Sequence, residues 1–531
     1  MGESGGTVRV FAFRVLRRRF SLCAFCTNAT RNGDQSFGHR FRVTPSRNDA
    51  ARKPEHLTKV SRFSPDWRLA VALGAAAVAF AVTAFAPQVL NDGDTFLHIA
   101  AGQRMLAQHA VLFRDPFSYT FAGAPWNAHE WLAEVLMALA YRAGGWSGLI
   151  GLFAAAAALT AGWLTYQLGR WLEPQAQAIT ALMALCCMTG SLLARPHLLA
   201  LPLLVIWSAE LVRARSESRG PSWWLLPVMT LWVNIHASFL LGLALAGGLA
   251  LEALTDEALP RAKTLRAWGA FGIGAICACL INPHFVQGVV FPLALMGTSS
   301  LANVDEWQPT DFSHLQPVEL VIAAALYVML SRGVKLSAVR TLILLALLHL
   351  TLQHQRHQIV VAAIAPLLLA EPMGRALQTG GERLRSWLSA GVAATALTLM
   401  LGLSVMRLAV PIVRGDGAVA PMSALAGVPQ ALRAAPVLND YSFGGYLIFA
   451  GVRPFIDSRA ELYGDAALAR YAALIRPDPR ALDAVIARYG IRWSILGPHS
   501  PMVAELDARP GWHRVHSDAF AIVHIRDSGA R

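Results

Sequence analysis

The stretch Asn91–Tyr141 reads NDGDTFLHIAAGQRMLAQHAVLFRDPFSYTFAGAPWNAHEWLAEVLMALAY, and it decides how the rest of the chain is organised. One apolar run precedes it (Leu69–Leu90) and another follows it (Trp146–Leu168). Each run has roughly the 20 residues that a helix needs to cross a bilayer. The polar stretch is therefore predicted to be a loop that leaves the membrane, with two acids, Asp92 and Asp94, at its mouth. Because charges beside a membrane span are costly to desolvate, this pair indicates the entrance of an active site.

The composition is that of a polytopic membrane protein. Of the 531 residues, 55% are hydrophobic and 15% are charged, whereas a soluble domain is about 45–50% apolar and about 25% charged. A net charge of +13 would suggest nucleic acid in a soluble protein. Here the Lys and Arg residues gather in the N-terminal tail and in alternate short loops, as the positive-inside rule describes. We therefore expect no nucleic-acid binding, and the six cysteines imply neither a zinc site nor a disulfide framework.

The chain divides into three predicted regions. Residues 1–67 predict a disordered, basic cytoplasmic tail. Residues 68–410 predict a polytopic membrane domain whose large first periplasmic loop covers residues 91–145. Residues 411–531 have more turn residues and predict a small periplasmic α/β domain. Its expected strands are Pro436–Leu438, Pro454–Ile456, Trp493–Leu496 and Phe520–Ile525, and its expected helices include Ala466–Ile475 and Arg480–Tyr489.

The predicted fold class is an α-helical integral membrane protein with about eleven spans. The spans are expected at residues 69–90, 146–169, 175–194, 197–213, 222–236, 237–255, 267–282, 316–331, 336–352, 357–371 and 387–409. Loops rich in Lys and Arg then fall on one side, which is cytoplasmic together with the N-terminus. Every cluster of His, Asn and acid falls on the other side, with the first loop and the C-terminal domain. This agreement supports the predicted topology.

The Asp92-Gly93-Asp94 motif is the first candidate for chemistry. One carboxylate could act as a general base, or both could coordinate a divalent cation. If the chain turns helical after Gly93, His98 lies on the same face as Asp94 and could share a proton or a metal ion with it. Asp92, Asp94 and His98 are therefore the catalytic candidates and, if a metal is bound, its candidate ligands. The alternative is that Asp94 only caps a helix over Thr95–Gln108.

Two further acidic groups are candidates for binding substrate. His129 and Glu130 precede Trp131 and an amphipathic run. They could bind substrate, or they could belong to an ordinary interfacial anchor, for which Trp is typical. Glu306 lies in another outer loop, and a solvated acidic loop is the alternative there.

Cations and histidines recur at the outer ends of predicted spans. They stand in the segments RPH, NIH, NPH and QHQRH, and they are Arg195, His197, His236, His284 and Arg356. A single histidine in such a place is usually a packing residue. Several on one face, with two arginines, could hold an anionic headgroup such as a phosphate or pyrophosphate.

The C-terminal region carries the segment FIDSR, which contains Asp457 and Arg459. It is predicted to follow a strand, where α/β folds place binding sites. Both residues are therefore candidates for substrate binding, and turn chemistry is the alternative.

The chain resembles the GT-C superfamily of glycosyltransferases, which use polyprenyl-phosphate sugars. The resemblance lies in the many spans, the D-x-D-like motif just after the first span, and the C-terminal periplasmic domain. A group of uncharacterised bacterial membrane proteins is more similar still, although the aromatic pair found in many of them is replaced here by Phe96-Leu97. The shared motifs are D-x-D-x-x-x-H-I-x-x-G (Asp92–Gly102), D-P-F-S-Y-T (Asp115–Thr120), H-E-W-L (His129–Leu132), the R-P-H, N-x-H and N-P segments, and G-G-Y-L-I followed by F-I-D-S-R.

The resemblance implies an inverting glycosyltransferase in the bacterial cytoplasmic (inner) membrane. It would move a hexosyl or pentosyl unit from a polyprenyl phosphate to a glycan, lipid or protein acceptor at the outer face. Asp92 or Asp94 would take the proton of the acceptor hydroxyl, while Arg195, Arg356 or a histidine would stabilise the departing phosphate. A divalent cation is a candidate cofactor. The rival is a transporter or a non-catalytic lipid- or glycan-binding scaffold, although transporter sites usually lie near the midplane of the bilayer.

Overall fold

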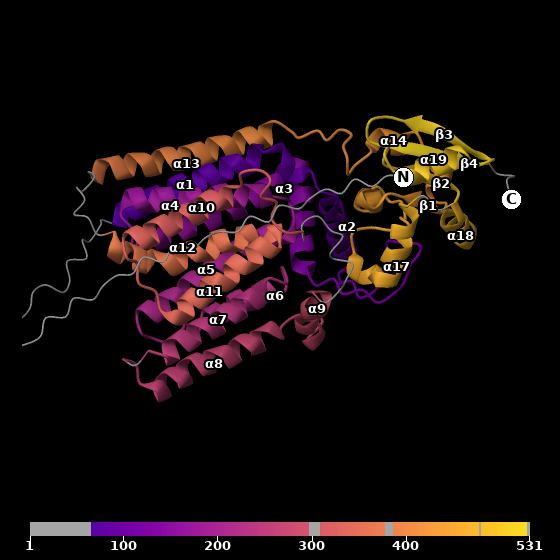
Figure 1. Ribbon diagram of the computed structural model, residues 1–531. Coiled ribbons are helices and arrows are strands. Elements are labelled where there is room, and N and C mark those ends of the chain that lie inside the picture. The colour runs from indigo at the N-terminus through magenta and orange to yellow at the C-terminus, as the bar shows by residue number, and fades with distance from the viewer. Residues whose placement is uncertain (1–64, 257, 297–307, 378–385, 477–478, 528–531) are drawn as a thin grey trace, which may run out of the picture. The chain divides into compact units, whose positions relative to one another are not determined.

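The computed structural model describes residues 65–256, 258–296, 308–377, 386–476 and 479–527, and most of them lie in helices. The predicted tail, residues 1–67, falls almost entirely outside the described residues. Long helices run side by side in the apolar part of the chain (Figure 1). Their bounds are α1 (Pro65–Phe85), α3 (Trp131–Leu168), α4 (Pro174–Met188), α5 (Pro196–Ser216), α6 (Leu225–Val233), α7 (Phe239–Leu254), α8 (Arg261–Cys279), α9 (Val286–Met296), α10 (Pro317–Ser331), α11 (Ala338–Gln353), α12 (Gln358–Ala376) and α13 (Ser386–Ala409).

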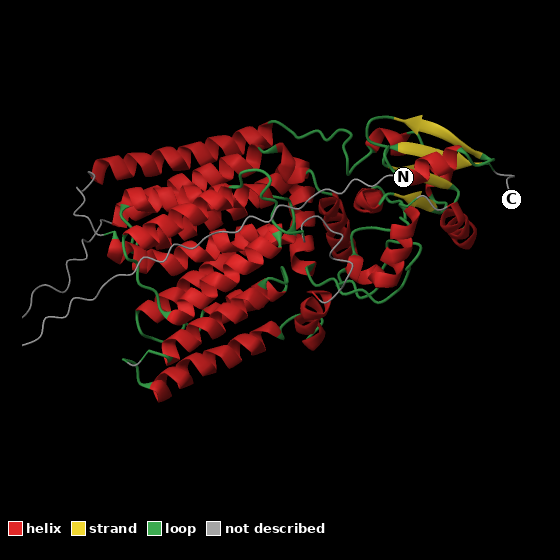
Figure 2. Cartoon of the chain, in the orientation of Figure 1, coloured by secondary structure: helices red, strands yellow, loops and turns green. Residues whose placement is uncertain are grey.

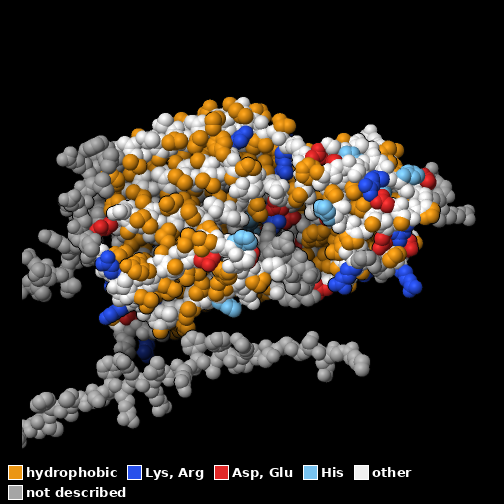
Figure 3. Space-filling view, turned by 45° about the horizontal axis from the view of Figure 1, so that its top comes forward, with side chains coloured by type: hydrophobic (Ala, Val, Ile, Leu, Met, Phe, Trp, Pro, Cys, Tyr) orange, Lys and Arg blue, Asp and Glu red, His pale blue; other side chains and the backbone are white. Residues whose placement is uncertain are grey.

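The apolar helices make this a multi-pass membrane protein. Among the described residues, five helical segments are long and apolar enough to cross a bilayer, namely Trp67–Phe85, Trp131–Leu168, Pro196–Ser216, Gln355–Ala376 and Gly391–Ala409. Shorter apolar helices include α7, α9, α10 and α11. Hydrophobic side chains cover most of the surface of the helical part in Figure 3. Each of the eleven predicted spans coincides with a helix, while the number of helices that cross the membrane stays a prediction.

Aromatic packing and helix-starting prolines fix the bundle. Proline begins both α4 and α5, where its missing N–H costs no hydrogen bond. The ring of Trp207 on α5 lies 6.5 Å from that of Trp232 on α6 and 5.5 Å from that of Phe271 on α8, between centroids. All three side chains are fully buried. These contacts join the middles of α5 and α8 to the C-terminal end of α6.

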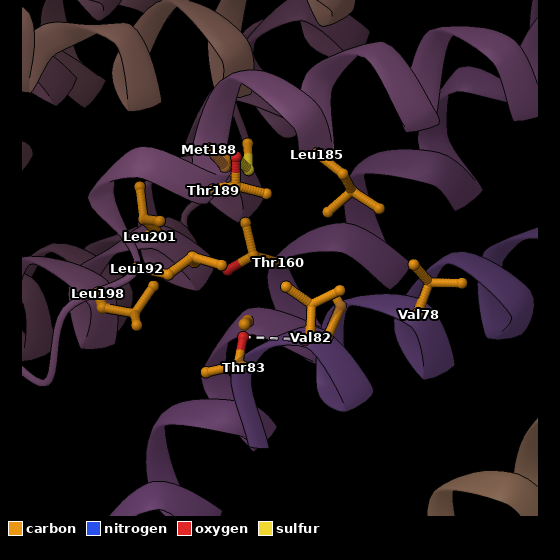
Figure 4. A pocket seen from close by; sticks show the side chains of 12 residues that line it. Val78, Val82, Thr83, Thr160, Leu185, Met188, Thr189, Leu192, Leu198 and Leu201 are labelled. Atoms are coloured by element: carbon orange, nitrogen blue, oxygen red, sulfur yellow. Dashed lines mark hydrogen bonds between the residues drawn. The ribbon is translucent and has the colours of Figure 1, made fainter. Parts of the chain in front are cut away.

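A small cavity of about 30 Å³ lies between α1, α3, α4 and α5 (Figure 4). The hydroxyls of Thr83 and Thr160 on its wall donate to backbone carbonyls of their own helices, at 2.8 Å each. The other lining residues are nearly all apolar. We interpret it as a packing cavity within the bundle, because none of the candidate catalytic side chains lines it.

Much of the first external loop is helical. The helix predicted after Gly93 is confirmed as α2 (Gly93–Gln108). The predicted amphipathic run forms the first turns of α3, which extends to Leu168 as two helical parts joined by a kink. A kink occurs at Gly144 and Gly145, where Gly145 has φ 57°, a left-handed conformation that favours glycine. The predicted span at residues 146–169 is the part of α3 beyond this kink.

Helix α2 packs closely against α3 at Gly102. A Cβ atom at this position would lie 2.0 Å from the carbonyl oxygen of Glu134 and 2.8 Å from the Cβ of Ala138. No side chain fits there without moving one helix. Since residues four apart lie on one face of a helix, this contact also directs His98 toward α3.

The C-terminal region contains one four-stranded sheet, and Figure 2 shows its strands as a single group. The strands are β1 (Val437–Asn439), β2 (Trp493–Leu496), β3 (Trp512–Ser517) and β4 (Ile522–Arg526), in the order β1-β2-β4-β3. β1 and β2 are parallel, and β4 is antiparallel to both its neighbours. The helices of this region are α14 (Met422–Ala426), α15 (Gln430–Arg433), α16 (Gly444–Phe449), α17 (Ala460–Leu474), α18 (Pro479–Tyr489) and α19 (Pro501–Asp507). The predicted α/β character is confirmed.

One predicted strand, Pro454–Ile456, is wrong, and β3 was not predicted. The side chain of Asn439 replaces the missing strand neighbour. Its Oδ1 accepts from the backbone N–H of Phe455 at 2.7 Å, and its Nδ2 donates to the carbonyl of Ile456 at 2.8 Å. The backbone polar groups of this segment are thus satisfied without strand pairing.

Side chains of the first loop bind directly to the C-terminal region. The hydroxyl of Tyr119 donates to the carbonyl of Val437 at 2.8 Å. The hydroxyl of Thr120 donates to the carbonyl of Phe455 at 2.7 Å. These bonds join residues more than 300 positions apart, so the two segments form one structural unit around α2.

Replacing Gly102 by alanine should destabilise the protein, although alanine favours a helix. The helix propensity gained is about 1 kcal/mol, whereas overpacking a close contact costs about 1–3 kcal/mol or more. Thermal unfolding of the detergent-solubilised protein measures the balance. Gly151→Ala is the matched control, because a Cβ atom on this α3 glycine meets nothing within 4 Å. A Gly102→Ala protein as stable as the control would contradict the close contact.

Candidate active site

Asp92, not Asp94, is the cap of α2. The side chain of Asp92 accepts a hydrogen bond from the backbone N–H of Asp94 at 2.9 Å, the usual geometry of an N-cap. Gly93 between them has no room for a side chain, since a Cβ there would lie 2.9 Å from the carbonyl oxygen of Ser442. The predicted capping role of Asp94 is therefore wrong, and its carboxylate is left for other partners.

Arg195 bridges the two carboxylates. It precedes Pro196 at the start of α5, so its side chain lies at the end of the bundle. Its Nε forms an ion pair with Oδ2 of Asp92, its Nη2 donates to Oδ1 of Asp92 at 3.0 Å, and Nη2 lies 3.2 Å from Oδ2 of Asp94. The side chain of Asp92 is 3% exposed and that of Asp94 is 23% exposed. Asp94 is therefore the acid that a ligand can reach.

The pKa values of the two carboxyl groups are shifted in opposite directions. Burial and the neighbouring Asp94 raise the pKa of Asp92, in spite of its ion pair with Arg195. Burial would also raise the pKa of Asp94, but Arg195, His98 and a hydrogen bond from Ser458 together lower it. Asp94 is thus held as a carboxylate, the form that a general base requires.

His98 is held by two glutamates of α3. Its Nδ1 lies 3.1 Å from Oε1 of Glu134, a buried residue, and its Nε2 lies 3.9 Å from Oε2 of Glu130. Burial disfavours the charged imidazole, yet the hydrogen bond to Glu134 and the charge of Glu130 raise the pKa of His98 to about 9. His98 is therefore an imidazolium at neutral pH.

Glu130 is surrounded by imidazole groups. Its Oε1 lies 3.8 Å from Nε2 of His129 and 3.6 Å from Nε2 of His236, in addition to the 3.9 Å between its Oε2 and His98. These separations are too long for hydrogen bonds. A water molecule or a ligand hydroxyl could bridge each of them. Glu130 is therefore a candidate for binding a ligand.

Other predicted residues lie around this centre. The Nε2 of His197 lies 3.0 Å from the carbonyl oxygen of Ser191, and its ring centroid lies 6.3 Å from that of His236. Arg356, in the short turn just before α12, lies close enough to contribute to the lowered pKa of Asp94. The structure thus brings together residues that the sequence separates widely: Asp92, Asp94, His98, His129, Glu130, Arg195, His197, His236 and Arg356.

Three predicted substrate-binding residues have other surroundings. Asp457 and Arg459 are buried and pair with each other, and Arg459 Nη1 also donates to Asp115 of the first loop at 2.8 Å. They join the loop to the C-terminal region, and their predicted part in substrate binding stays a prediction. His284 packs against Phe113, with 4.9 Å between ring centroids. A fourth predicted residue, Glu306, lies outside the described residues.

Sequence reasoning missed four residues of this site. Glu134 contacts His98, Ser458 helps to lower the pKa of Asp94, and the pKa of Tyr441 is raised by burial and by acids that include Asp94 and Glu461. Glu134 could have been noticed as an acid inside an otherwise apolar run, one helical turn after Glu130. The other three depend on the tertiary fold, and their sequence carries no comparable signal.

A divalent cation does not fit the carboxylates as the structure arranges them. Within the described parts of the chain, no three His, Cys, Asp or Glu side chains are grouped so that they could hold a metal ion. Arg195 is already ion-paired with both Asp92 and Asp94. A cation would have to displace this guanidinium, so no step below depends on a metal.

An apolar cavity of about 680 Å³ adjoins the polar cluster. It is bounded by the start of α3, by α6 and by α8, and its lining includes Trp131, Leu132 and Asn234. The indole N–H of Trp131 donates to Oδ1 of Asn234 at 2.7 Å. Trp131 follows Glu130 directly in the chain, so one wall of the cavity begins next to the residue that the imidazoles surround.

Comparisons with known proteins give structural neighbours only. No family model and no curated protein matches the chain. The structure is similar to that of ArnT from Cupriavidus metallidurans bound to undecaprenyl phosphate, with a TM-score of 0.48, 14% identity, and coverage of 87% of this chain and 98% of that one. ArnT from the same organism in the apo state has a TM-score of 0.47 and 13% identity, with coverage of 85% of this chain and 96% of that one. The apo oligosaccharyltransferase of Archaeoglobus fulgidus has a TM-score of 0.48 and 11% identity, with coverage of 81% of this chain and 69% of that one.

Replacing Glu134 by glutamine should weaken the protein in a pH-dependent way. Because the pKa of His98 is raised from 6.5 to about 9, its imidazolium stabilises the fold fully below pH 6.5 and loses this effect as the pH rises through about 9. The difference in thermal stability between wild type and Glu134→Gln should therefore be largest below pH 6.5 and shrink above pH 9. Glu173→Gln, at the start of α4 and without a capping bond, is the control. A pH-independent difference for Glu134→Gln would contradict the ion pair.

Proposed function

We propose that this protein is a membrane glycosyltransferase of the GT-C type, which transfers a sugar from a polyprenyl phosphate to an acceptor hydroxyl. The observation that carries the proposal is the ionised Asp94, set beside Arg195, His98 and Arg356 at the ends of membrane helices. A base and several cations at one place suit a displacement in which an alcohol attacks and a phosphate departs. The motifs around Asp92 that resemble this superfamily support the same conclusion.

The position of the site suits a lipid-linked donor. The polar cluster lies where apolar helices end, and the cavity of about 680 Å³ beside it has a mostly apolar wall. A phosphate at the cluster could therefore carry an isoprenoid chain that lies along α6 and α8. A soluble nucleotide sugar would have no need for this apolar surface.

Asp94 is the group we assign as general base. Its carboxylate takes the proton of the acceptor hydroxyl while the hydroxyl oxygen attacks the anomeric carbon. The bond between that carbon and the phosphate oxygen breaks, the electron pair leaves with the phosphate, and the configuration at the anomeric carbon inverts. Asp92 accepts from the backbone N–H of Asp94 and so fixes its place, while burial raises the pKa of Asp94, and Arg195 and His98 lower it, so that the ionised form is favoured.

Arg356 and His98 are assigned to the departing phosphate. Arg195 is engaged with the two carboxylates, so it serves mainly to position them. The imidazolium of His98 is fixed by Glu134, and its Nε2 has no partner within hydrogen-bonding distance among the described residues. A fixed cation of this kind stabilises the negative charge that develops on the phosphate.

Glu130 and its imidazoles are assigned to the hydroxyls of the donor sugar. The three gaps of 3.6–3.9 Å around this carboxylate can each be bridged by a hydroxyl group. Such bonds would orient the anomeric carbon toward Asp94. They would also distinguish one sugar from another, because a missing hydroxyl would leave a buried polar group unpaired.

Asp94→Asn should lower transfer by about 10²–10⁴-fold, the usual contribution of a general base. The measurement is mass spectrometry of lipid-linked and surface glycans in cells without the gene, complemented by wild type or variant. We expect wild type to restore one sugar, and the variant to accumulate its polyprenyl carrier instead.

The control is Asp483→Asn, an acid whose side chain is 67% exposed on α18, which should behave as wild type. A fully active Asp94→Asn would overturn the assignment of the base. Glycans that do not change with the gene, in cells that express the protein, would favour the transporter or scaffold instead.

The predicted cofactor, a divalent cation, needs a separate test. Because Arg195 is already paired with both carboxylates, we expect EDTA to leave the binding of undecaprenyl phosphate to the purified protein unchanged. Native mass spectrometry can measure this binding. A loss of binding in EDTA that Mg²⁺ or Mn²⁺ reverses would instead show a cation in the site.

A further inference from the structure

We propose that α9 lies in the outer surface of the bilayer, with one face against lipid and the other against the candidate active site. The inference goes beyond the proposed function, because it assigns a lipid-binding surface and depends on no sugar, donor or acceptor. Figure 1 shows α9 turned across the direction of α8, at the same end of the bundle as α2.

Helix α9 is apolar on every side. Its sequence is VQGVVFPLALM, which contains no charged residue and a single polar side chain, that of Gln287. Its 11 residues make a helix of about 16 Å, roughly half the thickness of the hydrocarbon core. Helix α9 is therefore too short to cross the membrane, and its composition suits either a protein core or the membrane surface.

One face of α9 is left uncovered by the described residues. Val286, Val290 and Leu293 recur on this face at helical spacing, and their side chains are 57%, 51% and 56% exposed. Gly288 and Pro292, on the opposite face, are buried. A protein core would cover both faces. Contact of the apolar face with water would be unfavourable, so the membrane surface is the location that fits.

The surface next to this face indicates lipid as its partner. Residues 267–280 of α8 carry no charge, and Ile273 and Ile276 among them are more than half exposed. Beyond the end of α8, Ile281 and Phe285 are also more than half exposed. In a multi-pass membrane protein, an uncharged helix surface of this kind faces hydrocarbon. The same apolar surface continues through Phe285 onto α9.

The turn between α8 and α9 fixes the direction of α9. The Nδ2 of Asn282 donates to the carbonyl of Cys279 at 2.8 Å and to that of Phe285 at 3.0 Å. Its Oδ1 accepts from the backbone N–H of His284 at 2.8 Å. Phe285 has φ 53°, a left-handed conformation that is rare for a bulky residue. A Cβ atom on Gly288 would lie 2.3 Å from Oδ1 of Asn282, so the first turn of α9 packs directly on this side chain.

The inner face of α9 contacts the candidate active site. The ring of Phe291 lies 5.0 Å from that of His129, between centroids, and Nε2 of His129 lies 3.8 Å from Oε1 of Glu130. The carbonyl of Ile281 accepts from Nδ2 of Asn234 at 2.9 Å, so the turn lies at the level where α6 ends. An ordinary interfacial helix turns a charged face to water, whereas protein covers this face of α9. Lipid would thus lie about one helix diameter, roughly 10 Å, from His129.

Photo-crosslinking in the full-length protein tests the partner of α9. The photoreactive residue p-benzoylphenylalanine replaces Val290 or Leu293, and the protein is reconstituted into nanodiscs of phosphatidylethanolamine and phosphatidylglycerol. Leu401, exposed on α13, is the control position for lipid contact, and Asp483, exposed on α18, is the control position for water. After ultraviolet irradiation, mass spectrometry of the intact protein identifies the adducts. We expect a phospholipid adduct at both α9 positions, as at Leu401, and none at Asp483.

Two results would overturn the inference. The absence of a phospholipid adduct at Val290 and Leu293, as at Asp483, would place this face in water. Adducts that join two protein chains would show that a second copy of the chain covers it. Because both replaced side chains are exposed, the larger ring should fit at either position, and one folded variant is enough to decide. The experiment contains neither donor nor acceptor, so its outcome is independent of the proposed function.

Discussion

A partly buried guanidinium that holds two carboxylates sets the arrangement at this end of the bundle. Charges removed from water must be paired, because an unpaired partner would cost several kcal/mol. Arg195 therefore fixes where α5 begins relative to Asp92, and Asp92 in turn fixes the start of α2. From this start α2 runs along α3 until it meets the contact at Gly102. The position of His98 beside Glu134 follows from these two fixed points.

The sequence predicted the parts of this structure that depend on local pattern. Apolar runs of bilayer length form helices, and the helix considered for Thr95–Gln108 is present as α2. The predictions that failed concern contacts between residues that lie far apart in the sequence. The segment near Phe455 looks like a strand, but the amide of Asn439 binds its backbone instead. No local pattern could show that Ser458 meets Asp94, since 364 positions separate them and only the folded chain joins them.

The two ion clusters of the structure differ in a way that separates binding from support. The three hydrogen bonds of the Arg459 guanidinium are short, from 2.7 to 2.8 Å, and the participating side chains are buried. Around Glu130 the distances to three imidazoles are all longer than a hydrogen bond. Both clusters look alike in the sequence, as acids near bases. Only the geometry shows that the side-chain contacts of the first cluster are short and those of the second are long.

The bond between Arg459 and Asp115 also bears on how the protein is made. The two residues lie 344 positions apart, so Asp115 leaves the ribosome long before its partner cation exists. All the membrane helices precede residue 410 and can insert while the first loop still lacks its counterpart. The final structure of the loop then waits for the last part of the chain to reach the same side of the membrane. Assembly of the site is thereby coupled to the completion of synthesis, and an unfinished protein in the membrane would not yet have it.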